Sequence, residues 1–235
     1  MSGAESPSSL DGVEIVLVDD AEEAAAHAAS LLAEAARAGA TIALSGGSTP
    51  RRAYVLAAGL EPDWSGADVW LGDERCVPAE DERANARLLR ETLLAGVERA
   101  PRVHLVPTEL SPDEAALAYD RALAGVHLDV ALQGLGGDGH TASLFPGAPS
   151  LEVTERRAVA ADAGLEPWVP RVTMTLPFLA SAAHVVFLAV GADKAEPARR
   201  AFVDPPSPET PASLLRSRSG RTTAILDRAA AARLA

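Results

Sequence analysis

The sequence predicts an α/β protein with an open, mainly parallel, Rossmann-like sheet that carries helices on both faces. Short apolar runs alternate with longer segments of helical composition along most of the chain. The run at residues 185–190 is apolar at every position, which is typical of a central strand that is buried on both faces. Such alternation of strands and helices favours parallel strands joined by helical crossovers.

The first half of the chain supplies four of the predicted strands. The run VEIVLV predicts a strand at residues 13–18, and the Ala/Glu-rich helix after it is capped by Asp19 or Asp20 and stopped at Gly39. Pro50 favours the start of a second helix, because proline suits the first helical position. Apolar periodicity predicts further strands at 41–44, 68–71 and 103–106, and helices at 83–94 and 113–123.

The second half continues the alternation. Strands are expected at 128–132, 171–176, 185–190 and 222–226, and helices at 192–202 and 228–234. Residues 204–220 are rich in Pro and Ser, so we expect a loop with at most one helical turn. The chain is therefore predicted to be a single α/β domain at residues 13–235, preceded by a disordered N-terminal tail at residues 1–12.

Composition excludes several classes of function. A net charge of −12 disfavours nucleic acid and anionic membrane surfaces as partners. No apolar run approaches the roughly 20 residues of a membrane helix, and the first residues lack the pattern of a signal peptide. Cys76 is the only cysteine, which excludes an intramolecular disulfide and fits a reducing compartment. We expect a cytoplasmic monomer that acts on a small molecule.

Four segments of unusual composition follow predicted strands. They are residues 45–49, 72–78, 134–140 and 191–194. Ligands of open α/β sheets bind outside the carboxyl ends of the strands. The four segments therefore predict one site at that edge of the sheet.

The segment SGGSTP predicts an anion-binding turn. Gly46 and Gly47 allow backbone N–H groups to point inward after Ser45, and Ser48 or Thr49 can cap the following helix. Free N–H groups and the helix dipole together attract anions. No lysine stands where a P-loop needs one, which disfavours hydrolysis of nucleoside triphosphates. An ordinary glycine-rich turn is the alternative.

The segment GLGGDGH matches the GxGxxG pattern of dinucleotide-binding proteins, but its context differs. Pro146 interrupts any long helix after it, and the segment lies past the middle of the chain, so we do not expect NAD. Gly136 and Gly137 allow the backbone to approach a substrate closely. His140 suits a general base near neutral pH, and Asp138 can orient it. The other four histidines are interpreted as structural.

The segment GDERCVP places polar groups at a third strand end. Asp73 and Arg75 are two residues apart, so they share a face of an extended segment. A solvated surface ion pair is the alternative. Cys76 as a nucleophile with His140 as its base is a weaker hypothesis, because lone buried cysteines are usually inert. Asp73, Cys76, Asp138 and His140 lack the spacing of a recognised metal site, so we expect no metal.

Lys194 is the only lysine among 21 basic residues. A compact ammonium on a flexible stem binds phosphate as a point charge. Arg171, at the start of another predicted strand, can add a second cation. Chance retention of one surface lysine is the alternative.

The motifs SGGSTP, GDERCVP, GLGGDGHTASLFPG, RVTMTLP and VGADKA, in this order, resemble the 6-phosphogluconolactonase family of the pentose phosphate pathway. The resemblance covers residues 13–226 and implies hydrolysis of the δ-lactone of 6-phosphogluconate, without metal or cofactor. The wider superfamily includes glucosamine-6-phosphate deaminases, which carry a glutamate five residues after the histidine. Phe145 occupies that position here, and Arg75 replaces the tyrosine of their Asp-Glu-Tyr element. Both differences favour the lactonase.

The resemblance and the residues together imply a set of roles. His140 would take a proton from water while Asp138 orients it, and Asp73 would hold a sugar hydroxyl. Arg75 would steady the phosphate or the oxyanion, and backbone donors of residues 136–139 would face that oxyanion. The phosphate would be held by Ser45, Gly46, Gly47, Ser48, Thr49, Lys194 and Arg171. A deaminase-like enzyme and a non-catalytic sugar-phosphate sensor remain as alternatives.

Overall fold

The computed structural model describes residues 8–10 and 12–234 of the chain. Its core is an eight-stranded sheet in which every neighbouring pair is parallel except β1 and β2, which are antiparallel. In spatial order the strands are β1 (Ser8–Leu10), β2 (Val13–Val18), β11 (Arg221–Asp227), β10 (His184–Ala189), β7 (Val130–Gly134), β3 (Thr41–Leu44), β4 (Asp68–Leu71) and β6 (Arg102–His104). The open, mainly parallel α/β sheet predicted from the sequence is thereby confirmed.

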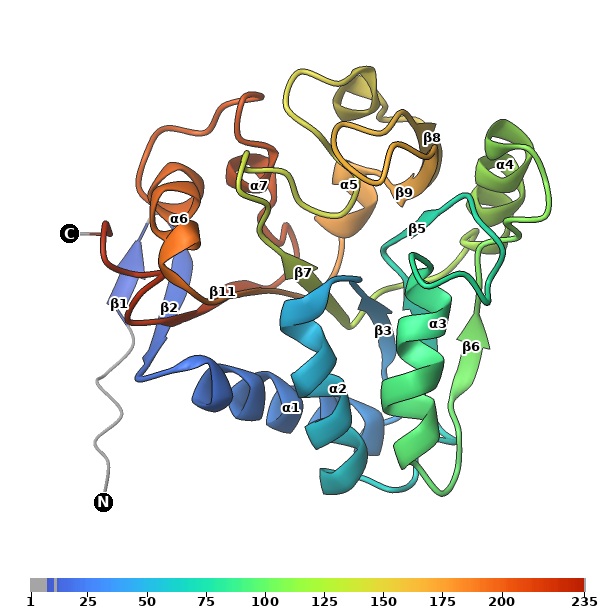
Figure 1. Ribbon diagram of the computed structural model, residues 1–235, viewed down its shortest axis with the longest axis horizontal. Coiled ribbons are helices and arrows are strands. Elements are labelled where there is room, and N and C mark those ends of the chain that lie inside the picture. The colour runs from blue at the N-terminus through green and yellow to red at the C-terminus, as the bar shows by residue number, and fades with distance from the viewer. Residues whose placement is uncertain (1–7, 11, 235) are drawn as a thin grey trace.

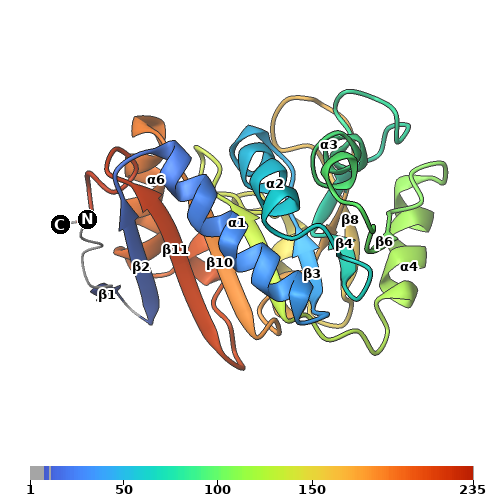
Figure 2. The ribbon, with the colours of Figure 1, turned by 90° about the horizontal axis from the view of Figure 1, so that it is seen from below.

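Helices cover both faces of this sheet (Figures 1 and 2). One face carries α1 (Ala21–Arg37), α2 (Ser48–Leu60) and α3 (Asn85–Leu89), whose last turn continues as a π-helix at Arg90–Leu94. The other carries α4 (Pro112–Ala122), α5 (Leu176–Leu179), α6 (Ala195–Phe202) and α7 (Pro211–Leu214). Short 3₁₀ turns lie at Pro149–Glu152 and Ala192–Lys194. No described helix has the length and apolarity that crossing a bilayer requires.

The alternation of side chains along each strand produces two separate hydrophobic cores. In β10, Val185 and Phe187 point into the core beneath α4–α7, whereas Val186 and Leu188 point into the core beneath α1–α3. Successive residues of a strand face opposite sides, so a strand that is apolar at every position must be covered twice. This explains why the continuous apolar run lies in the middle of the sheet.

A second, three-stranded antiparallel sheet was not predicted. It contains β5 (Asp73–Arg75), β9 (Arg171–Met174) and β8 (Ala158–Ala161), with β9 in the middle. The segment predicted at 171–176 is therefore a strand, but it ends at Met174 because Thr175 is the N-cap residue with which α5 begins. This small sheet brings β5, which follows β4 directly, over the carboxyl edge of the main sheet.

The order of the strands determines where a ligand site can form. From β3 the chain runs outward through β4 to β6, then returns to β7 beside β3 and continues in the other direction through β10 to β11. The connections after β3 and β7 therefore leave in opposite directions and open a crevice between them. Such a switch point is the usual ligand site of open α/β sheets.

Three predictions about the elements were wrong. Residues 8–10 of the expected disordered tail form β1, because their backbone pairs with β2; residues 1–7 and 11 lie outside the described part. The helix predicted at 228–234 is absent, and residues 228–233 form turns, since the Asp227 side chain bonds the Ala230 N–H and the segment is too short to propagate. Helix α2 begins at Ser48, two residues before Pro50.

Candidate active site

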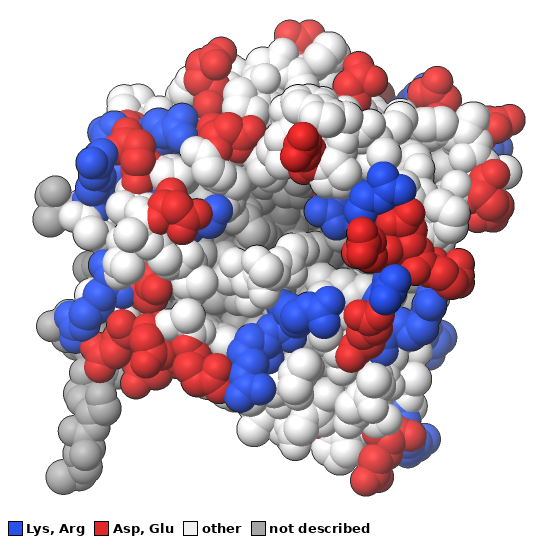
Figure 3. Space-filling model, viewed as in Figure 1, with Lys and Arg blue, Asp and Glu red and all other residues white. Residues whose placement is uncertain are grey.

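A cavity of about 610 Å³ opens at the switch point, on the face shown in Figure 3. Residues other than Lys, Arg, Asp and Glu form most of its visible wall, and side chains of both charge signs stand around its edge. The structure brings every site residue predicted from the sequence to this one cavity. They are Ser45, Gly46, Gly47, Ser48, Thr49, Asp73, Arg75, Gly136, Gly137, Asp138, His140, Arg171 and Lys194.

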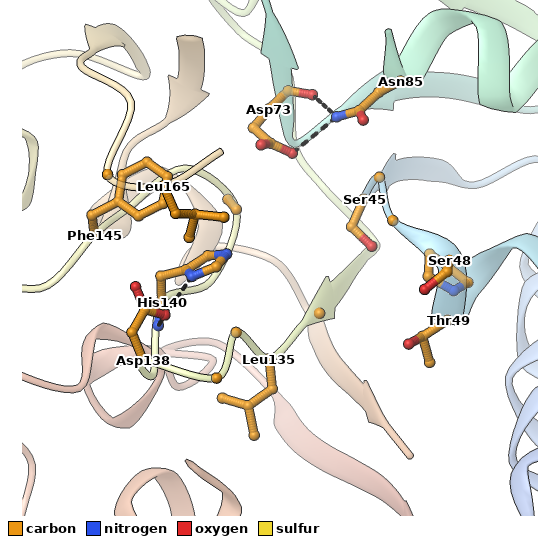
Figure 4. A pocket seen from close by; sticks show the side chains of 18 of the residues that line it. Ser45, Ser48, Thr49, Asp73, Asn85, Leu135, Asp138, His140, Phe145 and Leu165 are labelled. Carbon is orange, nitrogen blue, oxygen red and sulfur yellow. Dashed lines mark hydrogen bonds and ion pairs between the residues drawn. The ribbon is translucent and has the colours of Figure 1, made fainter. Parts of the chain in front are cut away.

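The loop after β7 holds His140 against Asp138 (Figure 4). Nδ1 of His140 lies 2.5 Å from Oδ1 of Asp138, and the same oxygen accepts the His140 backbone N–H at 3.0 Å. Partial burial opposes ionisation of Asp138, but the hydrogen bonds from His140 outweigh it and lower the pKa of this carboxyl. A carboxylate that accepts from Nδ1–H leaves Nε2 with its lone pair, as a general base requires.

The glycines of this loop have separate structural reasons. A Cβ atom on Gly136 would lie 2.1 Å from Nδ1 of His140 and 2.7 Å from Oδ1 of Asp138, so only glycine allows the pair to form. Gly139 has a φ of +95°, which favours glycine. The N–H groups of Gly136 and Gly139 bond within the loop, whereas that of Gly137 has no partner among the described residues. Gly137 is therefore the glycine whose N–H remains for a ligand.

The segment after β3 forms the glycine-rich turn for which anion binding was predicted, with one correction to its capping. Gly47 (φ +105°) is the N-cap, so Ser48 and Thr49 lie in the first turn of α2 and do not cap it. First-turn N–H groups have no partner inside a helix and can bind an anion. The Ser45 hydroxyl is buried without a partner in the described structure, and the Tyr54 hydroxyl holds the Ser45 carbonyl at 2.6 Å.

Asp73 is held on both of its carboxylate oxygens. Ser143 donates to Oδ2 at 2.6 Å, and Asn85 donates to Oδ1 at 3.2 Å and to the Asp73 carbonyl at 2.7 Å. The Asp73 side chain is nearly buried, but it still lines the cavity. The alternative of a solvated Asp73–Arg75 ion pair does not occur among the described residues, because Arg75 donates instead to the oxygens of Arg83 and Asn85.

Arg75 and Arg171 lie directly opposite each other in the β5–β9 pair. Like charges in this arrangement repel, and neither guanidinium has a salt bridge with a carboxylate within the described chain. Burial, and then the charge of Arg75, lowers the pKa of Arg171, which nevertheless stays protonated. Two neighbouring guanidinium groups that are bonded only to neutral oxygens favour the approach of an anion.

Arg171 also has a role that the sequence did not indicate. Its Nε donates to the carbonyl of Val169 at 3.1 Å, and its Nη2 donates to those of Pro167 and Leu165 at 3.1 and 3.4 Å. Residues 164–166 of the same loop line the cavity. One buried side chain therefore shapes the cavity wall and presents positive charge to it.

Lys194 enters the cavity from the turn after β10. Its Nζ lies 3.1 Å from Oδ2 of Asp193, which is mostly exposed. The Asp227 carboxylate accepts the Gly191 N–H at 3.0 and 3.1 Å and fixes the start of this turn. Gly191 has a φ of +98°, which favours glycine there. Lys194 is thus presented by a turn that the last strand anchors.

Three further residues that line the cavity were not among the predicted site residues: Phe145, Leu165 and Asn85. The Phe145 ring centre lies 4.9 Å from the centre of the His140 imidazole, and Leu165 lines the same cavity. Asn85 lies across the cavity from them and bonds both Asp73 and Arg75. A signal for Asn85 was present, since it is the only asparagine of the chain just as Lys194 is the only lysine.

The geometry also bears on the weaker hypotheses. Cys76 does not line the cavity, and burial raises the pKa of its thiol, which disfavours a nucleophilic thiolate. No three His, Cys, Asp or Glu side chains within residues 8–10 and 12–234 are grouped so that they could hold a metal ion.

The chain is similar to known proteins over nearly its whole length. The model of the family described as "Glucosamine-6-phosphate isomerases/6-phosphogluconolactonase" matches residues 17–224. A 6-phosphogluconolactonase of Streptomyces coelicolor is 35% identical, over 91% of this chain and 90% of that protein. A 6-phosphogluconolactonase of Rhizobium meliloti is 40% identical, over 69% of this chain and 73% of that protein.

Solved structures show the same architecture. The 6-phosphogluconolactonase of Trypanosoma brucei superposes with a TM-score of 0.84 at 28% identity, over 97% of this chain and 100% of that one. A monomeric glucosamine-6-phosphate deaminase superposes with a TM-score of 0.83 at 19% identity, over 93% of this chain and 99% of that one. The second likeness concerns the fold alone.

Proposed function

Because the chain belongs to the glucosamine-6-phosphate isomerase/6-phosphogluconolactonase family, we propose that it hydrolyses 6-phospho-D-glucono-1,5-lactone to 6-phospho-D-gluconate in the oxidative pentose phosphate pathway. The observation that carries the proposal is the shared cavity. A His–Asp pair lies on one side of it, and the anion-binding turn at Ser45–Thr49 lies on the other (Figure 4). A phosphorylated substrate held at the turn can present its far end to the imidazole.

The proposed reaction needs one base and one stabilised oxyanion. Nε2 of His140 takes a proton from water, and the resulting hydroxide attacks C1 of the lactone. The carbonyl electrons move to oxygen, and the oxyanion faces the Gly137 N–H and the neighbouring cations. The tetrahedral intermediate then collapses, the bond from C1 to the ring oxygen breaks, and His140 returns its proton to that oxygen. The carboxylic acid formed then loses its proton to water.

The surrounding residues are proposed to bind and orient the substrate. The turn after β3, Lys194 and Arg171 hold the 6-phosphate, while Asp73 accepts a hydrogen bond from a sugar hydroxyl. Arg75 stabilises the negative charge that develops on the carbonyl oxygen of the lactone. The lactone also opens unaided in water, so an acceleration of roughly 10²–10⁴-fold from a positioned base, with electrostatic stabilisation added, suffices.

The side chain of Phe145 supports the lactonase over the deaminase. Phe145 occupies the position of the deaminase glutamate and covers one side of the His140 ring with apolar surface. Ring opening of an amino sugar by that route needs an ionisable group at this point, whereas hydrolysis of a lactone does not. A non-catalytic sensor would need the phosphate-binding residues but not the oriented imidazole of His140.

The decisive experiment follows consumption of freshly prepared 6-phosphogluconolactone, corrected for spontaneous hydrolysis. Glucosamine 6-phosphate is tested in parallel for release of ammonia. Lactone turnover without ammonia release supports the proposal. Ammonia release would support the deaminase, and saturable binding of 6-phosphogluconate without turnover of either compound would support the sensor.

We also propose that the enzyme works as a cytoplasmic monomer without a cofactor. Every residue assigned a role comes from one chain, and a lone half-buried thiol is compatible with a reducing compartment. Light scattering at assay concentration tests the monomer. Activity of the dialysed, reduced protein without additions tests the independence from a cofactor.

A further inference from the structure

Asn85 connects three segments of the cavity that the sequence separates. It is the first residue of α3, it is 2% exposed, and it lines the cavity. Its Nδ2 donates to the backbone oxygen of Asp73 at 2.7 Å and to Oδ1 of Asp73 at 3.2 Å. Its Oδ1 accepts from Nη1 of Arg75 at 2.6 Å. A Cβ atom on Gly46 would lie 1.9 Å from the same Oδ1, so the amide packs directly on the anion-binding turn.

Only a carboxamide satisfies these contacts at this size. The donor must face an acidic side chain and a carbonyl, while the acceptor faces a guanidinium. Asparagine supplies both in one planar group, whereas aspartate lacks the donor and leucine lacks both. Buried polar groups that lose a partner carry a large cost, so this position is closely specified.

The start of α3 is itself held in place. Glu74 accepts the backbone N–H of Asn85 on Oε1 and that of Ala86 on Oε2, both at 2.8 Å. The charged groups in contact with the Asn85 side chain are Asp73 and Arg75 of β5, while Glu74 contacts its backbone and Arg171 of β9 lies opposite Arg75. The Gly46 turn brings no ionisable group to it.

We propose that Asn85 is a positioning residue of the lactonase reaction. Its amide fixes the positions of the Asp73 carboxylate and of the Arg75 guanidinium relative to the anion-binding turn. This role rests on the proposed function, because the positioned groups are those assigned to the substrate. Without the amide, Asp73 keeps only the Ser143 bond to its carboxylate and Arg75 keeps only the Arg83 carbonyl. Both side chains then move relative to the phosphate.

Two variants of similar size test this role. Asn85→Asp keeps an acceptor for Arg75 but places a second carboxylate against Asp73, and Asn85→Leu removes both polar contacts. We expect kcat/KM for 6-phosphogluconolactone to fall by about ten- to a hundredfold in each near pH 8. The melting temperature reports whether each variant is folded, and the affinity for inorganic phosphate reports whether the phosphate-binding residues are intact.

The pH profile separates positioning from mere packing. Two adjacent carboxylates raise the pKa of the pair, so the carboxylate introduced by Asn85→Asp gains a proton as the pH falls and can again donate to Asp73. The ratio of variant to wild-type kcat/KM should therefore rise by several-fold from about pH 8 to about pH 5.5 for Asn85→Asp and stay flat for Asn85→Leu.

Each outcome distinguishes the two proposals. Full activity of both variants beside an active wild type would overturn the role of Asn85 and leave the proposed function intact. The same would follow from equal, pH-independent losses in folded variants, which would indicate packing alone. An inactive wild type would overturn the proposed function, and the positioning role with it.

Discussion

One oxygen of Asp138 holds both the ring and the backbone of His140: Oδ1 lies 2.5 Å from Nδ1 and 3.0 Å from the backbone nitrogen. The loop thus fixes the orientation of the imidazole and its tautomer with a single carboxylate. Gly136 makes this possible, since any side chain there would occupy the space of the pair. The pairing of Asp138 with His140 therefore depends on the glycine-rich loop that carries both residues.

Removal of the imidazole should abolish most of the catalysis and little of the binding. For His140→Ala we expect kcat to fall by roughly 10²–10⁴-fold, because the positioned base is lost. Asp138→Asn should lose less, since the imidazole remains but its tautomer is no longer fixed. Steady-state kinetics give kcat, and titration with 6-phosphogluconate gives binding. Near wild-type kcat in His140→Ala would show that another group is the base.

The buried Glu74 should make stability depend on pH near neutrality. Burial raises the pKa of this carboxyl from about 4.5 to about 6, although three backbone N–H groups oppose the shift. The folded state therefore binds the proton more tightly than the unfolded state does. The resulting stability is present below about pH 4.5 and is lost as the pH rises through about 6, and it amounts to about 2 kcal/mol.

The variant Glu74→Gln isolates this contribution, because glutamine does not titrate. The difference in free energy of unfolding, wild type minus variant, should fall by about 2 kcal/mol between about pH 4 and pH 7.5. Urea denaturation at several pH values measures it. Because both proteins contain His184, whose pKa is lowered to about 4 by burial, its opposite pH dependence cancels in the difference. A constant difference would mean that Glu74 has an ordinary pKa.

Arg171 should tolerate lysine poorly, even though the charge is kept. Its guanidinium donates to three carbonyls of the loop at Leu165, Pro167 and Val169, and a single ammonium cannot span them. For Arg171→Lys we expect faster hydrogen exchange at residues 162–170 and a loss of about tenfold in kcat/KM. Arg102→Lys, which changes an exposed ion pair with Asp68, is the control and should alter neither. Unchanged exchange would remove the loop-holding role.

Sequence patterns were sufficient for the parts of the molecule governed by local periodicity. The strands at the switch point and the glycine-rich turns were predicted because apolar runs and glycines mark them directly. The small antiparallel sheet was not predicted, because β5 and β9 are three and four residues long and pair although Asp73 and Thr173 are 100 positions apart in the sequence. Strands this short gain their stability from tertiary contacts that no local pattern encodes.

The candidate site shows the same division. The residues on glycine-rich turns, such as His140 and Ser45, were predicted from their neighbours in sequence. Asn85 was not, since its sequence neighbours have ordinary helical composition and it reaches the cavity only through the packing of α3 on β5. The loop-holding bonds of Arg171 likewise depend on a backbone path that the sequence does not reveal. The available signal was that Asn85, like Lys194, is the only residue of its type in the chain, and this signal was applied to Lys194 but not to Asn85.

Chelation should leave the activity unchanged. The His, Cys, Asp and Glu side chains of the described residues form no group of three that could hold a metal ion. Exhaustive dialysis against EDTA, followed by the lactone assay, tests this expectation. Loss of activity that Zn²⁺ or Mn²⁺ restores would contradict it and would require ligands that the proposed mechanism does not use.

Lys194 should matter only for substrates that carry phosphate. A charge-assisted contact of its ammonium with the 6-phosphate is worth about 1.5–3 kcal/mol, or about ten- to a hundredfold in kcat/KM. Lys194→Ala should lose this factor with 6-phosphogluconolactone and almost nothing with unphosphorylated gluconolactone. Asp193→Asn is the matched control: it removes the carboxylate that lies 3.1 Å from Nζ, so it should leave phosphate binding unchanged or strengthen it. The decisive quantity is the ratio of kcat/KM for the two lactones in each protein. An equal loss with both would make Lys194 catalytic or structural, and no loss with either would leave the phosphate to Arg171, Arg75 and the turn after β3.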